Sequence, residues 1–117
     1  MDYSNILEQL LLEFPELKED RNDNEHLQDL PHCFFDIVFV PFIVNACKNE
    51  KQELLVKVGG FLEQMAFCDD KKVRELLNVS ILEPLVLEKE NMISFLKHFL
   101  GKETLKELEY WEKRYNK

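Results

Sequence analysis

The stretch that decides the fold runs from Pro31 to Lys48 and reads PHCFFDIVFVPFIVNACK. Its apolar residues surround a helix completely instead of forming one stripe, and a helix that is apolar on all sides is surrounded by protein. Pro41 predicts a kink, because an internal proline forfeits one backbone hydrogen bond. A buried strand is the competing interpretation, but the length of the run and the polar Asn45 and Lys48 favour a helix. We therefore expect a helix at the centre of the fold.

The composition of the whole chain agrees with a helical fold. The 117 residues are 45% hydrophobic and include only 3 Gly and 4 Pro, with abundant Leu, Glu and Lys, which favour helices. This length is typical of one domain and is sufficient for a hydrophobic core. We predict a single all-α domain over residues 1–117, with about six helices packed as antiparallel hairpins around the central apolar helix.

The segments before the central helix predict one helix and one loop. Ser4 can cap a helix whose apolar positions follow the i, i+3, i+4, i+7 pattern. Pro15 ends this helix, because the residue before a proline avoids the helical conformation. Residues 18–29 read KEDRNDNEHLQD, with Leu27 as the one aliphatic side chain. This composition predicts a solvated acidic loop.

The chain after the central helix begins with an amphipathic pattern over residues 50–67. Gly59 and Gly60 destabilise such a helix, so we expect a neighbouring backbone to approach closely there. Asp69 or Asp70 then caps the next helix. The connection is short, which predicts an antiparallel helical hairpin.

The C-terminal third is expected to contain the end of this helix and two further helices. The helix that follows the acidic cap closes before Pro84, because a proline disfavours the helical conformation in the residue before it. Residues 88–100 form a further helix, with Gly101 in the left-handed position that follows a helix. Residues 104–115 form the last helix.

Negative charge is concentrated at the N-terminal end. Residues 1–29 hold 9 of the 23 acids and 2 of the 15 bases, a net charge of −7 out of −8 for the chain. A field confined to one segment can steer a basic partner and suppress wrong ones. The alternative is that the expected loop is only a soluble linker. The candidate partner-binding carboxylates are Glu16, Glu19, Asp20, Asp23, Glu25 and Asp29.

Several classes of ligand and location are disfavoured. The sequence pI near 4.9 argues against a direct nucleic-acid ligand, because neutralising phosphates requires clustered Lys and Arg. The start, MDYSNILEQ, has no basic region followed by an apolar core, so we expect no secretory signal there. The most apolar stretch, residues 34–44, falls short of the roughly 20 residues of a membrane span. We therefore expect a cytoplasmic monomer or dimer whose partner is a basic protein and not a membrane.

Asp36 is the one acid inside the apolar segment, and a buried carboxylate must be paired or protonated. His32 lies one turn before it, so we predict that His32 and Asp36 form a structural polar pin. Lys97, His98 or a hydroxyl group are the alternative partners for this carboxylate.

No motif predicts catalysis or a cofactor. Cys33 and His32 are adjacent, so on a helix they point in different directions, and a nucleophile needs its base within hydrogen-bond reach. His26, His32 and His98 do not form a set with metal-ligand spacing. We expect no enzymatic activity, no cofactor and no bound metal.

Two resemblances extend this interpretation. Residues 69–77, DDKKVRELL, resemble the second helix of a HEAT-type repeat, in which an acid precedes a Val-Arg pair and an apolar stripe. Nearly the whole chain is similar to an uncharacterised family of small bacterial helical proteins. The segments that carry this similarity are FPEL (14–17), LPH (30–32), VPF (40–42), FLEQMA (61–66), VSILE (79–83), and LG (100–101) with TL (104–105).

The resemblance implies a HEAT-like helical array and a role similar to that of the immunity partners of secreted bacterial toxins. It brings no catalytic residues. We therefore expect a protein-binding module that neutralises a toxin, such as a nuclease, by masking the basic surface of its active site. The alternative function is a HEAT-like adaptor that grips a peptide or protein in a groove between helices.

Overall fold

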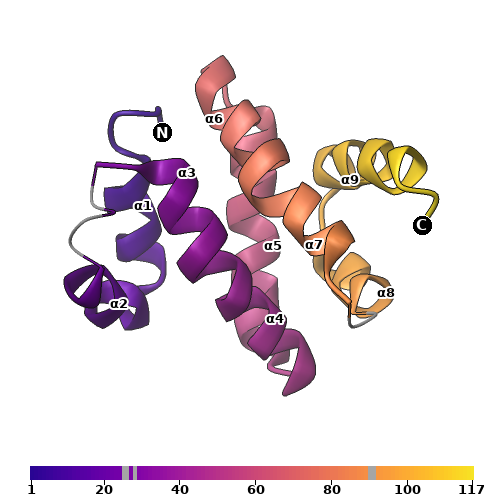
Figure 1. Ribbon diagram of the computed structural model, residues 1–117, viewed down its shortest axis with the longest axis horizontal. Coiled ribbons are helices and arrows are strands. Elements are labelled where there is room, and N and C mark those ends of the chain that lie inside the picture. Colours follow the sequence, from indigo (N-terminus) through magenta and orange to yellow (C-terminus); the bar gives the residue numbers. More distant parts are fainter. Residues whose placement is uncertain (25–26, 28, 90–91) are drawn as a thin grey trace.

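The computed structural model describes residues 1–24, 27, 29–89 and 92–117, and every regular element among them is helical (Figure 1). The all-α prediction is confirmed. Two short elements, η1 and η5, are 3-10 helices, and η3 and η4 are π-helical turns. In chain order the elements are α1 (Ile6–Glu13), η1 (Pro15–Leu17), α2 (Lys18–Asp23), α3 (Pro31–Phe34), η3 (Phe35–Phe39), α4 (Val40–Lys48), α5 (Gln52–Phe67), α6 (Lys71–Leu77), η4 (Asn78–Leu82), α7 (Glu83–Leu87), α8 (Ile93–Leu96), η5 (Lys97–Phe99) and α9 (Lys102–Arg114).

Two long helices lie side by side and run in the same direction. The first joins α3, η3 and α4 without a break, and the second joins α6, η4 and α7. Their π-turns contact each other, and α4 contacts α7. In Figure 1, α5 runs behind these two helices, and it packs against α4, α6 and α9. A return helix between two parallel helices is what the short connections predict.

Both long helices contain a proline that directly follows a π-turn. The N–H of Val40, the residue before Pro41, donates to the carbonyl of Phe35, five residues back. The N–H of Glu83, the residue before Pro84, likewise donates to the carbonyl of Asn78. The wider turn relieves the clash that a proline ring makes with the preceding turn of an α-helix. The prediction that the helix closes before Pro84 is therefore wrong, since it continues to Leu87.

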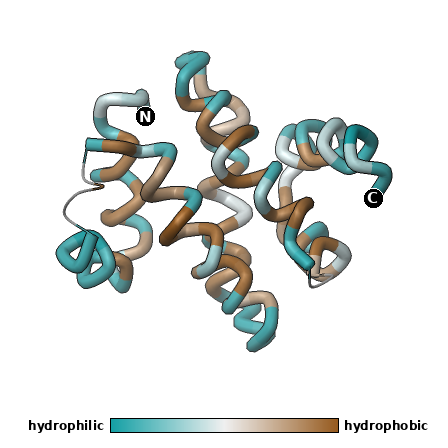
Figure 2. The backbone as a smooth tube through the Cα atoms, in the orientation of Figure 1, coloured by the Kyte–Doolittle hydropathy of each residue, from teal (hydrophilic) through white to brown (hydrophobic). Residues whose placement is uncertain are grey.

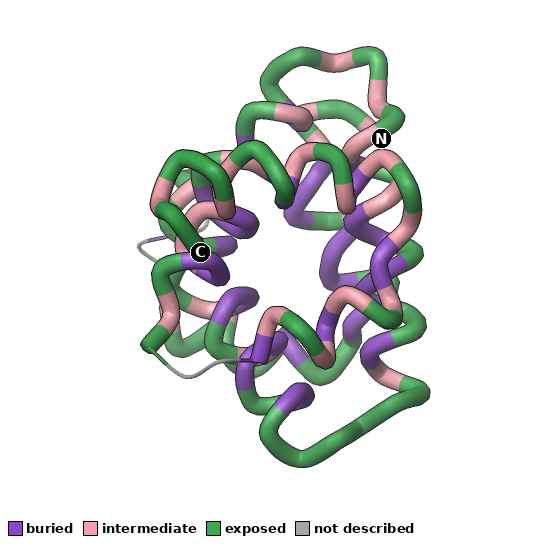
Figure 3. Tube along the Cα trace, turned by 90° about the vertical axis from the view of Figure 1, so that its right-hand side faces the viewer, coloured by how far each residue is buried: buried purple, intermediate pink, exposed green. Residues whose placement is uncertain are grey.

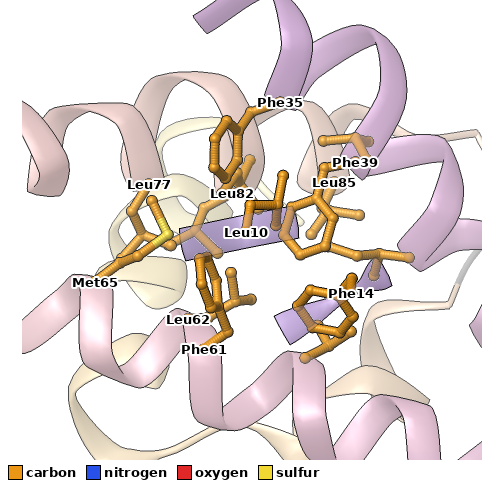
Figure 4. Close-up of a cluster of buried hydrophobic side chains, with 14 of the residues drawn as sticks. Leu10, Phe14, Phe35, Phe39, Phe61, Leu62, Met65, Leu77, Leu82 and Leu85 are labelled. Atoms are coloured by element: carbon orange, nitrogen blue, oxygen red, sulfur yellow. The ribbon is translucent and has the colours of Figure 1, made fainter. Parts of the chain in front are cut away.

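The core is a cluster of aromatic and aliphatic side chains that α1, α5, α9 and both long helices contribute, and Figure 4 shows part of it. Phe14, at the end of α1, lies 5.4 Å from Phe39 and 5.8 Å from Phe61 between ring centroids. Phe39 and Phe61 lie 6.1 Å apart. These three rings tie α1 to the first long helix and to α5. Figure 3 shows the buried segments facing the interior of the helical assembly.

The first long helix is partly open to solvent, whereas its composition predicts burial on all sides. Cys33 and Asp36 are exposed, and Ile37 is 55% exposed. By length and composition alone the helix could cross a membrane, with a mean hydropathy of 1.2, but 44% of it is buried inside the fold. The core helix of a globular protein has the same properties.

Asp70 caps α6, as predicted, and also binds the backbone of the N-terminal segment. Its carboxylate accepts hydrogen bonds from the backbone N–H of Tyr3 and of Lys72, both at 2.9 Å. These two bonds lower the pKa of Asp70. The predicted cap at Ser4 is wrong, because its hydroxyl donates to Asp2 instead, and α1 begins at Ile6 with no side-chain cap.

Glu63 caps α9 from outside that helix. Its carboxylate accepts hydrogen bonds from the N–H of Glu103 at 3.1 Å, the N–H of Thr104 at 2.9 Å and the Thr104 hydroxyl at 2.7 Å. Gly101 has a φ of −78°, so the left-handed conformation predicted there is wrong. A side chain at Gly101 would instead overlap the Glu63 carboxylate. The tertiary cap explains this glycine.

The two glycines of α5 have different environments. A Cβ atom at Gly59 would overlap the carbonyl oxygen of Phe99, so the predicted close approach of a backbone is confirmed there. At Gly60 no described atom beyond the local backbone of α5 lies within 4 Å of the added Cβ, so the prediction is wrong for this residue. The helix predicted over residues 88–100 is shorter than expected and consists of α8 and η5.

The last helix, α9, is held against the second long helix by polar contacts at the ends of η4. The Trp111 indole donates to the Asn78 side chain at 2.9 Å, and the Tyr115 hydroxyl donates to the Glu83 carboxylate. Leu108 of α9 is fully buried. Figure 1 places α9 at the opposite end of the long axis from α1 and α2.

Candidate functional site

Part of the predicted acidic loop, residues 18–29, is helical. Lys18–Asp23, which we predicted as part of a loop, forms the short helix α2 with no buried residue of its own. Leu17, which is 1% exposed, and Leu27, which is 4% exposed, anchor the segment on both sides of α2. The sequence pattern did not reveal this helix because its anchors lie outside it. Glu25, one of the predicted carboxylates, lies outside the described residues.

The other five predicted carboxylates are all exposed. Glu19 and Asp23 are one helical turn apart on α2, and Glu16 precedes Asp20 by the same spacing. Residues at this spacing share one face of a helix, and like charges placed there repel each other. We call this set the acidic surface: Glu16, Glu19, Asp20, Asp23 and Asp29.

The bases of the last helix do not neutralise the acidic surface. Within the described ranges, the ion pairs of α9 join Lys106 to Glu103 at 3.2 Å and Lys113 to Glu109 at 3.0 Å. Glu112 of the same helix pairs with Lys97 at 2.9 Å. The acidic surface lies on α2, which is hydrophilic in Figure 2, and on residues beside it, and Figure 1 places α2 far from α9. Its field is therefore directed toward solvent.

An ion pair fixes α2 against α1. The guanidinium of Arg21 lies 2.9 Å from the Glu8 carboxylate. Arg21 is one of the two bases in residues 1–29. Because its guanidinium pairs with Glu8, it does not neutralise the carboxylates of the acidic surface. The Arg21–Glu8 ion pair therefore holds α2 in place without using a carboxylate of the acidic surface.

Two hollows border the acidic surface. One, of about 310 Å³, is lined by residues that include Tyr3, Arg21 and Asp29. The other, of about 260 Å³, lies between α1 and α2 and includes Leu12, which is 72% exposed. An exposed leucine beside a charged rim adds apolar area that a protein interface would remove from water. Leu12 is absent from the residues predicted for the site, although three consecutive leucines cannot all face one core.

The predicted polar pin is wrong. Asp36 is exposed, so it needs no partner, and the His32 ring nitrogen Nδ1 lies 2.6 Å from the Ser80 hydroxyl. This contact joins the two long helices instead of two residues of one helix. The apolar pattern could not reveal which side of the first helix is open to solvent.

The structure directs His32 away from its neighbour Cys33. Cys33 is exposed and free, and the neighbouring His32 is directed to Ser80. In the described part of the chain, no three His, Cys, Asp or Glu side chains are grouped so that they could hold a metal ion. His26 lies outside the described residues.

The chain belongs to the protein family described as Domain of unknown function (DUF7674), whose model matches residues 7–117. The predicted resemblance to an uncharacterised helical family is confirmed at this level. No curated protein and no solved structure matches the chain.

Proposed function

We propose that this member of the DUF7674 family is a non-enzymatic binding protein whose acidic surface engages a basic protein. The observation that supports it is the exposure of Glu16, Glu19, Asp20, Asp23 and Asp29 on α2 and beside it, with Lys106 and Lys113 of α9 paired within their own helix. Clustered like charges on a short helix reduce its stability. A cationic partner would offset this repulsion.

In the specific form of the proposal, the partner is a bacterial toxin with a basic active site, such as a nuclease, and the chain is its immunity protein in the cytoplasm. Carboxylates of the acidic surface would take positions that substrate phosphates otherwise occupy. Leu12 would supply an apolar anchor beside them. Such an interface associates rapidly at low salt and more slowly as the ionic strength rises.

The test is the association rate with the basic C-terminal domain of a toxin encoded beside the gene, measured by surface plasmon resonance at two salt concentrations. The variant Glu19→Gln, Asp20→Asn, Asp23→Asn should associate about tenfold more slowly at low salt. The matched control, with the same change of charge at exposed positions elsewhere, is Asp36→Asn, Asp69→Asn, Glu75→Gln. Equal rates for the two variants would refute the electrostatic mechanism.

A second candidate function is a HEAT-like adaptor that grips a peptide. It is supported by the two parallel helices with matched π-turns, whose prolines lie 43 residues apart, within the roughly 40–47 residues of HEAT-type repeats. Ile37 and Val79, on the two π-turns, are 55% and 45% exposed. An adaptor would lose binding when both are changed to serine, and its affinity would respond little to salt.

A further inference from the structure

A hollow of about 670 Å³ lies where the end of α7, the elements α8 and η5, and the end of α9 meet. It has more than twice the volume of either hollow beside the acidic surface, and its volume is in the range of small-molecule binding sites. Figure 1 places α8 and α9 far from α2, so a ligand in this hollow would not contact the acidic surface. We call it the α8 hollow, and its walls include Val86, Lys89, Ile93, Ser94, Lys97 and Lys117.

An ion pair between two elements fixes one wall of the α8 hollow. The ammonium of Lys97, in η5, lies 2.9 Å from the carboxylate of Glu112, in α9, and the two side chains are 41% and 18% exposed. An ammonium group has three donors, and this pair uses one of them. Lys97 therefore keeps N–H groups for an acceptor inside the hollow. Because the ion pair already holds its side chain, binding costs less conformational entropy than it would with a free lysine.

The charged side chains around the α8 hollow favour an anionic ligand. Three lysines and two glutamates line it, whereas the whole chain contains 15 bases and 23 acids. The charge of Glu112 is offset by Lys97, which leaves Lys89 and Lys117 against Glu88. Neither of these two ammonium groups forms an ion pair with a residue that the structure describes. A bound anion would supply the missing partner.

Apolar side chains form another part of the wall. Val86, which is 3% exposed, and Ile93, which is half-buried, border the same hollow. The Ser94 hydroxyl and the His98 imidazole are exposed beside them and can donate hydrogen bonds. Small-molecule sites combine apolar walls with a few polar groups that fix the orientation of the ligand. A ligand that matches this hollow therefore carries a negative charge at one end and hydrocarbon at the other.

We propose that the α8 hollow binds a small amphipathic organic anion, a carboxylate with a hydrocarbon chain. The carboxylate accepts hydrogen bonds from Lys97 and is attracted by Lys89 and Lys117. The hydrocarbon chain packs against Val86 and Ile93, where its burial removes apolar area from water. This site is separate from the acidic surface and does not depend on the function proposed above.

The test is an NMR titration of the full chain with octanoate, followed through its backbone amide signals at low salt. We expect a Kd of about 1 mM, typical of a ligand with so few atoms, with shifts concentrated at Ser94, Lys97 and His98 and none on α2. Two further probes separate the parts of the proposal. Octylammonium has the same chain with the opposite charge, and inorganic phosphate has negative charge without a chain. Both should bind the α8 hollow at least tenfold more weakly, by about 1.4 kcal/mol.

Two variants at exposed positions locate the site. Lys89→Gln, Lys117→Gln should weaken octanoate binding about fivefold, by removing two cations. Ser94→Trp should abolish it by filling the hollow, and the lysine variant decides the outcome if this one fails to fold. The matched control removes the same charge at exposed positions elsewhere, Lys51→Gln, Lys71→Gln, and should bind octanoate as the natural chain does.

Three results would overturn the proposal. One is the absence of octanoate-induced shifts at Ser94, Lys97 and His98. Another is binding of octylammonium or phosphate in the α8 hollow as tight as that of octanoate. The third is an equal octanoate affinity for the lysine variant and its control. No basic protein is present in this experiment, so its failure would leave the proposed function untouched.

Discussion

The capping of α9 by Glu63 gives a quantitative prediction for stability. Replacing Glu63 with alanine removes the acceptor of three hydrogen bonds, two from backbone N–H groups at the first turn of α9. Loss of such a cap costs about 1 kcal/mol, and loss of a negative charge at a helix N-terminus costs about 0.5 kcal/mol more. We expect Glu63→Ala to lower the free energy of unfolding by about 1.5 kcal/mol, or roughly 6 °C in Tm.

The contribution of Glu63 should also depend on pH. Burial acts to raise the pKa of this carboxyl, but the hydrogen bonds from Thr104 and Glu103 outweigh it, so the pKa lies below its ordinary value of 4.5. The folded state then binds fewer protons than the unfolded state just below pH 4.5. The stabilisation is therefore complete above this value and disappears as the pH falls through the lowered pKa. The difference between the natural chain and Glu63→Gln should shrink accordingly.

The measurement is urea unfolding followed by circular dichroism at several pH values between 3 and 7. Glu53→Gln is the matched control, because Glu53 lies on the same helix and is exposed. If Glu63→Gln and Glu53→Gln lose equal stability at pH 7, or if the Glu63→Gln deficit persists unchanged at pH 3, the capping role is refuted.

Three further substitutions test other contacts. Asp70→Ala should cost about 1 kcal/mol and speed hydrogen exchange at the Tyr3 amide, which NMR can follow. Gly59→Ala should destabilise the fold by about 3 kcal/mol in urea unfolding, because its Cβ has no space beside the Phe99 carbonyl; a neutral effect would contradict this packing. Phe14→Ala removes a fully buried ring and should cost about 4 kcal/mol by the same method, whereas a loss below about 1 kcal/mol would show that the aromatic cluster is not the core.

Local signals in the sequence predicted the parts of the fold that local physics controls. Pro15 follows the end of α1, the amphipathic pattern over residues 50–67 became α5, and Asp70 caps α6. Each of these depends on the conformation or hydrogen bonds of a few neighbouring residues. The N-terminal concentration of carboxylates was equally visible, because charge can be counted without knowing the fold.

Features that depend on distant residues were not predictable in this way. The helical conformation of α2 depends on the burial of Leu17 and Leu27 against the rest of the chain. The exposure of Asp36 depends on which neighbours cover the first long helix. A helix that is apolar on all sides does not indicate which side faces solvent. Leu12 was visible in the sequence, but the hollow beside it requires α2 to lie against α1.

The two prolines show how one rule of local physics can give a wrong boundary. A π-turn contains one residue more than an α-helical turn, and each additional residue rotates the following side chains by about 100°. If only one of two packed parallel helices contained such a turn, its apolar face would rotate away from its neighbour. Here both helices contain one at the same level, directly before Pro41 and Pro84, and the two turns contact each other. The faces therefore stay matched, and tertiary packing supports the helix across Pro84 where local preference would end it.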